Sequence, residues 1–230
     1  MSLLTKVKSR LKSYTRPLPM EEFEDYDVYW ESRGNEPKIR PRWVIAVDKI
    51  PDGSSVLDVG CSTGGFMAYL LSRRPNVKVR GTDVSQGALD IASEAGFDVF
   101  PADLTQEPLD REYDYITCFE VIEHIHEAEK VLVHLRDATR KQLIMSLPNL
   151  GYIEHRVRLG IFGRFPNTSL VLHAKEHIRH WSVRDFRDWA DHFGLDVVSV
   201  EGQKGFPIVP WKKFPSLFAA QVVYTLEPRR

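Results

Sequence analysis

Apolar and polar residues alternate in two rhythms from residue 54 onward. Short runs rich in β-branched and aromatic residues, which are typical of buried strands, occupy residues 55–59, 77–82, 97–100, 114–118, 142–146, 196–201 and 218–226. Between most of these runs, apolar residues recur at helical spacing. Strands that alternate with helices are typical of a parallel sheet with crossover helices. The pattern therefore predicts an α/β fold with a doubly wound, seven-stranded sheet and helices on both faces.

Capping and turn residues locate the helices and the last connection. The helix after the first strand opens at Gly64, a second begins at Ser85, and a third begins at Ser182. Asp185 stands three residues after Ser182, as in a capping box. The segment 202–216 joins the last two runs and is rich in Gly and Pro, so it has no room for a crossover helix. The last strand is therefore expected to be antiparallel, in a sheet that is otherwise mostly parallel.

The first 48 residues differ from the rest of the chain. Residues 1–16 carry only basic charges and place apolar residues at helical spacing, and two prolines and an acidic stretch follow. We interpret residues 1–48 as an N-terminal helical cover and residues 49–230 as the main domain. A basic amphipathic helix can also lie on an anionic membrane surface, which is the less favoured interpretation of residues 1–16.

Composition narrows the class of protein. The 230 residues are 43% hydrophobic, enough for one sizeable core. The 31 basic and 32 acidic residues nearly cancel, which argues against a surface adapted to DNA. No apolar run approaches the roughly 18 residues that span a membrane. With two cysteines and no visible secretory signal, the protein is expected in the cytoplasm. Nothing in the pattern indicates an oligomeric state.

The segment from Val56 to Phe66 carries the strongest functional signal. A buried strand runs into small residues and then a helix, so backbone N–H groups can approach a ligand closely. The Gly60-x-Ser62-x-x-Gly65 spacing is by itself a weak, incomplete dinucleotide fingerprint. Asp58 stands two residues before Gly60, where a carboxylate would repel a pyrophosphate but would suit an ammonium group.

Two further acids follow the next predicted strands. Asp83, followed by Val84, can accept hydrogen bonds from two ribose hydroxyls. Asp103 and the backbone amide of Leu104 can hold the edge of an adenine. Carboxylates at three successive strand ends indicate one binding crevice more strongly than three unrelated loop acids.

These residues, together with the run from Tyr113 to His124, resemble the ordered motifs of class I S-adenosylmethionine-dependent methyltransferases. The resemblance covers roughly residues 40–200 and implies a Rossmann-like sheet and S-adenosyl-L-methionine as the cofactor. It implies contacts with the cofactor for Asp58, Gly60, Gly64, Asp83, Asp103 and Phe119.

The resemblance also suggests which group binds the cofactor carboxylate and where the chain departs from the family. An arginine just before the first strand often takes this role, here Arg42 or Arg40. The family usually has glycine where this chain has Ser62. A side chain there can tighten the turn but leaves the helix N-terminus intact, so Ser62 is still expected at the cofactor.

The run Glu120-x-x-Glu123-His124 supplies the candidate chemistry. Its spacing predicts three side chains on one side of a helical turn, beside the transferred methyl group. Two carboxylates and an imidazole suit Mg²⁺, Mn²⁺ or Zn²⁺. The same run resembles that of the ubiquinone-pathway O-methyltransferases and the small-RNA 2′-O-methyltransferases, which implies a metal next to the acceptor oxygen. We expect His177 as the fourth ligand. The alternative has His124, assisted by Glu123, acting as a base without a metal.

Residues 145–188 resemble the methionine-biosynthesis MetW proteins, which implies an inserted lid over about 149–181. Its arginines could attract an anionic acceptor, although such a charge run is more often a solvated face. The favoured function is methyl transfer to an oxygen of a small molecule. The alternatives are a MetW-like cofactor-binding partner of another enzyme and an RNA 2′-O-methyltransferase.

Overall fold

A seven-stranded sheet forms the centre of the computed structural model, which describes residues 39–166, 177–205 and 212–229. The strand order is β3-β2-β1-β4-β5-β7-β6. The bounds are β1 Ser55–Val59, β2 Lys78–Asp83, β3 Val99–Pro101, β4 Tyr113–Phe119, β5 Thr139–Pro148, β6 Leu195–Gly205 and β7 Ala219–Pro228. The first five strands pair in parallel, whereas β7 runs antiparallel to both β5 and β6. Both the mostly parallel sheet and its antiparallel last strand are confirmed.

Seven α-helices and one 3₁₀ turn accompany the sheet in the described residues. Their bounds are α3 Pro41–Lys49, α4 Gly65–Arg73, α5 Gln86–Glu94, the 3₁₀ turn Ile122–His124, α6 Ala128–Asp137, α7 Ile153–Phe162, α8 Val183–His192 and α9 Pro215–Phe218. Ser85 caps α5 and Ser182 caps α8, where Asp185 completes the predicted capping box. Within this part of the chain, no helix combines the length and the apolar character needed to cross a bilayer.

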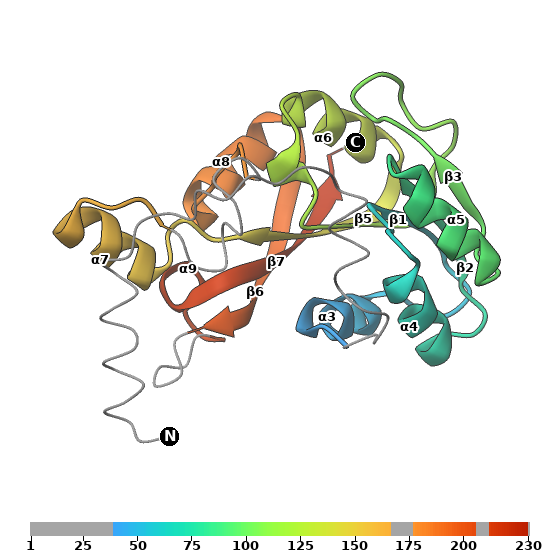
Figure 1. Cartoon of the computed structure of the whole chain (residues 1–230), viewed down its shortest axis with the longest axis horizontal. Coiled ribbons are helices and arrows are strands. Elements are labelled where there is room, and N and C mark those ends of the chain that lie inside the picture. Colours follow the sequence, from blue (N-terminus) through green and yellow to red (C-terminus); the bar gives the residue numbers. More distant parts are fainter. Residues whose placement is uncertain (1–38, 167–176, 206–211, 230) are drawn as a thin grey trace.

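The helices cover both faces of the sheet (Figure 1). On one face, α6 and α8 bury apolar side chains against β4, β5 and β7, and the rings of Phe186 and Tyr224 lie 4.0 Å apart. On the other face, α3 and α4 pack together, with Ala46 and Phe66 in one buried cluster with Val56. The predicted domain boundary at residue 48 falls inside α3, because the apolar side of that helix belongs to the core of the domain. The remainder of the predicted cover, residues 1–38, lies outside the described residues.

The arrangement of the crossovers determines where a ligand can bind. Strand β1 lies between β2 and β4. The chain passes from β1 to β2 and β3 on one side, and the connection after β3 then crosses to β4 on the other side. In such sheets the connections diverge at this point, which opens a crevice beyond the carboxyl ends of the two central strands. The segments that follow β1, β2 and β4 meet there.

Candidate functional site

The loop between β1 and α4 is a tight backbone turn. Gly60 and Gly64 have φ angles of 71° and 83°, and Gly64 is the N-cap of α4. A Cβ on Gly60 would lie 2.3 Å from a methyl group of Val121, and one on Gly64 would lie 2.6 Å from the ring of Phe97. Glycine is therefore required at both positions. The contact with Val121 also shows that the loop after β4 lies directly against this glycine loop.

Ser62 occupies the centre of this turn with a φ of 50°. An L-residue is uncommon in that region because its Cβ is crowded by the backbone. The backbone N–H of Ser62 donates to Asp83 Oδ2 at 2.9 Å. Its hydroxyl oxygen is buried and has no hydrogen-bond partner in the structure. The turn therefore accepts serine, and it leaves one polar group in the crevice for a ligand.

The predicted acids lie at or just beyond the carboxyl ends of the adjacent strands β1, β2 and β3. Asp58 is 3% exposed and accepts a hydrogen bond of 2.7 Å from the Thr117 hydroxyl. Burial, and secondarily the charge of Asp83, raises the pKa of Asp58 to about 7, although Thr117 and Arg42 act in the opposite direction. The carboxylate of Asp83 also accepts from the backbone N–H of Ser85 at 3.0 Å. A buried carboxyl group with a raised pKa and a well-oriented carboxylate thus lie at neighbouring strand ends.

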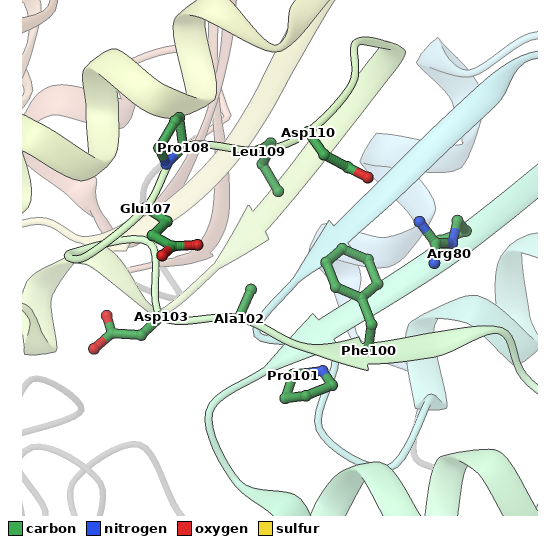
Figure 2. A pocket seen from close by; sticks show the side chains of 9 residues that line it. All are labelled: Arg80, Phe100, Pro101, Ala102, Asp103, Glu107, Pro108, Leu109 and Asp110. Carbon is green, nitrogen blue, oxygen red and sulfur yellow. The ribbon is translucent and has the colours of Figure 1, made fainter.

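Asp103 lies at the rim of the crevice and is exposed. Its Oδ1 accepts from the backbone N–H and the hydroxyl of Thr105, at 2.9 and 2.6 Å, and these bonds lower the pKa of Asp103. A cavity of about 390 Å³ lies beside it, with Glu107 on the same side and Arg80 on the other (Figure 2). The Asp103 carboxylate thus caps its own turn and lines this cavity.

The remaining predicted cofactor contacts differ in exposure. Val84 is 76% exposed and Leu104 is 6% exposed. The Leu104 side chain belongs to the core cluster, so only the backbone of this residue can contact a ligand. Phe119 packs edge-on against Phe66, with ring centroids 5.1 Å apart.

Glu120 does not share a turn with Glu123 and His124. It has a φ of 56° and precedes the 3₁₀ turn, which differs from the helical geometry expected from the spacing. Its carboxylate accepts from Ser146 and Gln221, and Arg42 lies 3.7 Å away. The structure therefore separates Glu120 from the other three predicted metal ligands.

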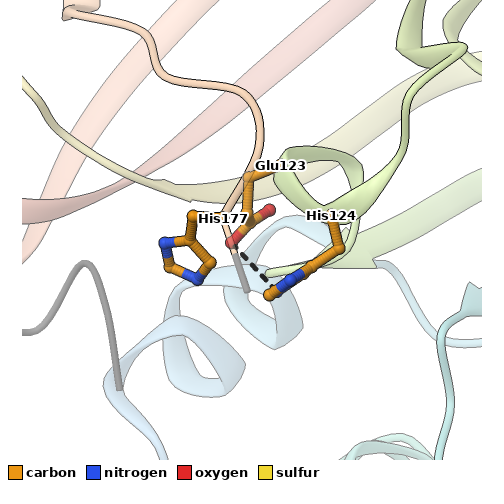
Figure 3. Close-up of side chains that lie close together, drawn as sticks. All are labelled: Glu123, His124 and His177. Atoms are coloured by element: carbon orange, nitrogen blue, oxygen red, sulfur yellow. Dashed lines mark ion pairs between the residues drawn. The ribbon is translucent and has the colours of Figure 1, made fainter. Parts of the chain in front are cut away.

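Glu123, His124 and His177 do come together. One ligand atom from each lies within 4.8 Å of the other two, and their side chains converge in Figure 3. The Glu123 side chain is 1% exposed, and the His124 and His177 ring centroids are 4.6 Å apart. Burial lowers the pKa of His177 to about 3, with smaller contributions from His124 and His180. The cluster thus offers one carboxylate and a neutral imidazole of His177, to which His124 adds a second ring.

Backbone and side-chain contacts hold the end of the predicted lid on this cluster. The N–H groups of Ile178 and Arg179 both donate to the carbonyl of Glu123 at 3.0 Å. Arg179 also forms two bonds to the Glu129 carboxylate, at 2.8 and 2.9 Å. Sequence reasoning missed Glu129, because nothing in its pattern distinguishes it from a solvated helix residue.

Most arginines of the predicted lid form hydrogen bonds within the protein, so fewer of their charges are available to a ligand than the composition suggests. Arg156 donates to the carbonyl of Gly151 and the buried Arg158 donates to that of Phe165. With Arg179 bonded to Glu129, three of the lid arginines serve contacts within the protein. Residues 167–176 of this lid lie outside the described residues.

Comparison with known proteins agrees with this geometry. A family model described as a methyltransferase domain matches residues 30–200. The ubiquinone biosynthesis O-methyltransferase of Nitrosomonas europaea is 32% identical over 131 residues, 50% of this chain and 55% of that protein. The bifunctional methionine biosynthesis protein MetXA/MetW of Rhodopirellula baltica is 28% identical over 153 residues, 60% of this chain and 24% of that protein. The chain thus spans about half the length, or less, of these curated relatives.

A solved structure shares the fold. The magnesium protoporphyrin IX methyltransferase of Synechocystis PCC 6803, with bound SAH, superposes with a TM-score of 0.57 at 18% identity, covering 98% of this chain and 95% of that one. The strand order of the sheet agrees with the family match, and the family model covers most of the sequence. The chain therefore belongs to the methyltransferase-domain family of class I S-adenosylmethionine-dependent methyltransferases.

Proposed function

We propose that the protein transfers the methyl group of S-adenosyl-L-methionine to an oxygen of a small-molecule acceptor. The crevice fits that cofactor on its own chemistry. The hydroxyl of Ser62 and the Nε of Arg42 are buried without a hydrogen-bond partner, so both can serve a polar ligand. In this proposal Asp83 holds the ribose, Asp103 the adenine amine, and Asp58 lies near the ammonium group.

The cluster of Glu123, His124 and His177 is the observation that carries the proposal for oxygen as the acceptor atom. Methyl transfer to a hydroxyl requires removal of a proton, whereas the sulfonium itself needs only alignment and exclusion of water. Because Val121 contacts Gly60, the turn that bears Glu123 and His124 begins beside the cofactor loop. His124 is 21% exposed in its side chain and can accept a proton from an acceptor hydroxyl. The similarity to a ubiquinone biosynthesis O-methyltransferase supports the same acceptor atom.

We further propose that this cluster binds a divalent cation. One carboxylate oxygen and two imidazole nitrogens form a ligand set that suits Zn²⁺ or Mn²⁺ better than Mg²⁺, which prefers oxygen. The Nδ1 of His177 is buried without a hydrogen-bond partner, which fits a ring that is available as a ligand. A bound ion would lower the pKa of the acceptor hydroxyl. Glu120, which the sequence placed in this set, is not part of it.

The test combines cofactor binding with metal dependence. Calorimetric titration with S-adenosyl-L-methionine should give one site per chain. Methyl transfer to a panel of phenols and catechols should be lost after exhaustive chelation and restored by Zn²⁺ or Mn²⁺. The variant His177→Ala should not be restored, whereas His126→Ala, an exposed histidine nearby, should behave as the wild type. Full transfer by the chelated protein would rule out the metal and leave His124 as the base.

A second function is favoured by the MetXA/MetW similarity and by one surface feature. Helix α7 exposes Leu159, Ile161 and Phe162, with exposed fractions of 54%, 73% and 39%. Apolar groups gathered on one exposed helix are typical of a protein-binding surface. In this alternative the chain binds the cofactor and supports another enzyme. Tight cofactor binding without transfer to any acceptor in the panel would favour it.

A further inference from the structure

Glu120 is held in a strained and closely bonded position. A positive φ is costly for a residue with a side chain and persists only where its surroundings fix it. Here the backbone N–H of Glu120 donates to the carbonyl of Ser146 at 2.9 Å. Its Oε1 accepts from the Ser146 hydroxyl at 2.8 Å, and its Oε2 accepts from the Gln221 amide at 2.9 Å. Ser146 is fully buried and Gln221 is 7% exposed, so the carboxylate has little freedom to move.

The carboxylate of Glu120 faces a buried guanidinium. Arg42, on α3, is 8% exposed, and its Nη1 lies 3.7 Å from Glu120 Oε1. Its Nε is buried and has no hydrogen-bond acceptor in the structure. Arg40, the other candidate from the sequence, instead lies over the ring of Trp43, 5.7 Å from its centroid. Of the two arginines, Arg42 is therefore the one oriented by the sheet.

We propose that Glu120 is a positioning residue that orients Arg42 to bind the carboxylate of the cofactor's methionine moiety. This inference rests on the cofactor binding in the proposed function and assigns Glu120 a role other than metal ligation. A guanidinium binds a carboxylate through two neighbouring N–H groups, so its rotation about the side chain must be fixed. Glu120 fixes the Nη1 end and leaves the Nε N–H for the ligand. Glu120 adjoins the cofactor loop, because the next residue, Val121, contacts Gly60. Arg42 pairs with Glu120 and lies near enough to Asp58 for its charge to act on that carboxyl group.

The location of the other carboxylates supports this division of roles. Glu123 belongs to the cluster with His124 and His177, whereas Glu120 is bonded to β5 and β7 through Ser146 and Gln221. To act as a metal ligand in the cluster, Glu120 would have to break its hydrogen bonds with both Ser146 and Gln221. Substitutions of the two glutamates are therefore expected to have different effects. A change at Glu123 should alter binding of the proposed metal, whereas a change at Glu120 should alter recognition of the cofactor carboxylate.

The test compares two ligands that differ only in this carboxylate. Calorimetry measures the affinities of S-adenosylmethionine and of decarboxylated S-adenosylmethionine, which keeps the ammonium and the sulfonium. The wild type should prefer the carboxylate form by about 10- to 100-fold, as expected for charge-assisted hydrogen bonds. Glu120→Gln should lower the affinity for S-adenosylmethionine about tenfold and change the affinity for the decarboxylated ligand less than twofold. Arg42→Gln should show the same pattern, and the double variant should lose little more, because both residues act on one contact.

Glu123→Gln is the matched control and should retain the wild-type ratio of affinities. Ser146→Ala removes only one hydroxyl and should lower the ratio in the same direction, so a poorly folded Glu120→Gln would not prevent the test. An equal loss for both ligands, an unchanged ratio, or tighter binding of S-adenosylmethionine in Glu120→Gln would overturn the inference. Equal affinities in the wild type would overturn it as well. These results leave the proposed function intact, whereas failure of the wild type to bind either ligand would overturn both.

Discussion

Asp58 is expected to destabilise the protein at alkaline pH in the absence of cofactor. Burial raises its pKa in the folded state to about 7, with Asp83 adding to the shift and Arg42 and Thr117 opposing it. The unfolded chain has a pKa of about 4 for this group. The folded state therefore holds a proton that the unfolded state releases. The stability that this proton brings is complete below about pH 4 and is lost as the pH rises through 7.

The magnitude follows from the size of the shift. A shift of about three pKa units lowers the free energy of unfolding by roughly 4 kcal/mol at pH 8, where Asp58 is ionised in both the folded and the unfolded state. At pH 5 the loss is less than half of that. Asp58→Asn keeps an oxygen that can accept the hydrogen bond from Thr117 but removes the charge. Its advantage in free energy of unfolding over the wild type should therefore grow by about 3 kcal/mol between pH 5 and pH 8. Urea unfolding at the two pH values measures this difference.

Asp83→Asn is the matched control for this substitution. The Asp83 carboxylate accepts backbone N–H groups from Ser62 and Ser85, so its loss should destabilise the protein at both pH values. An Asp58→Asn variant that is less stable than the wild type at pH 8, or whose advantage does not change with pH, would refute the explanation. If the cofactor ammonium lies near Asp58, as proposed, binding at pH 7 should also release about half a proton, which calorimetry in buffers of different ionisation enthalpy detects.

Two further substitutions test the packing around the site. Gly64→Ala should destabilise the protein by more than about 2 kcal/mol in urea unfolding, because the new Cβ would lie 2.6 Å from the Phe97 ring. Gly53→Ala has a similar φ of 80° but open space around it, so a loss near 1 kcal/mol is expected, and equal losses would contradict the steric explanation. His155 is 1% exposed, and burial, with Arg158 and His180 nearby, lowers its pKa to about 4. The neutral His155 ring contributes its full share of stability above pH 6.5. The free energy of unfolding falls by about 3 kcal/mol from this group alone as the pH drops to 4. His155→Phe should therefore lose less stability than the wild type between pH 7 and pH 4 in urea unfolding, and parallel pH profiles would exclude this role.

The fold was predictable because its determinants are local in the sequence. Runs of β-branched residues place the strands, and Ser182 with Asp185 specifies the start of α8 through bonds only three residues apart. The glycine loop was predictable for the same reason, since Gly60 and Gly64 are fixed by φ angles that few other residues adopt. The packing of α3 was not predictable in this way, because its apolar side packs on α4 and β1 and an N-terminal charge pattern carries no information about that contact.

Glu120 shows where spacing stops being informative. Glu123 stands three positions after it, and a continuous helix would place both carboxylates on one side. The chain instead leaves β4 with a φ of 56° at Glu120 and only then enters the short 3₁₀ turn. What determines this conformation is remote in the sequence, because Ser146 is 26 residues away and Gln221 is 101 residues away. No local pattern reports a side chain whose orientation is set by two other strands. Motif spacing thus singled out both glutamates, whereas the pairing of β5 with β7 decides which carboxylate joins His124 and His177 and which faces Arg42.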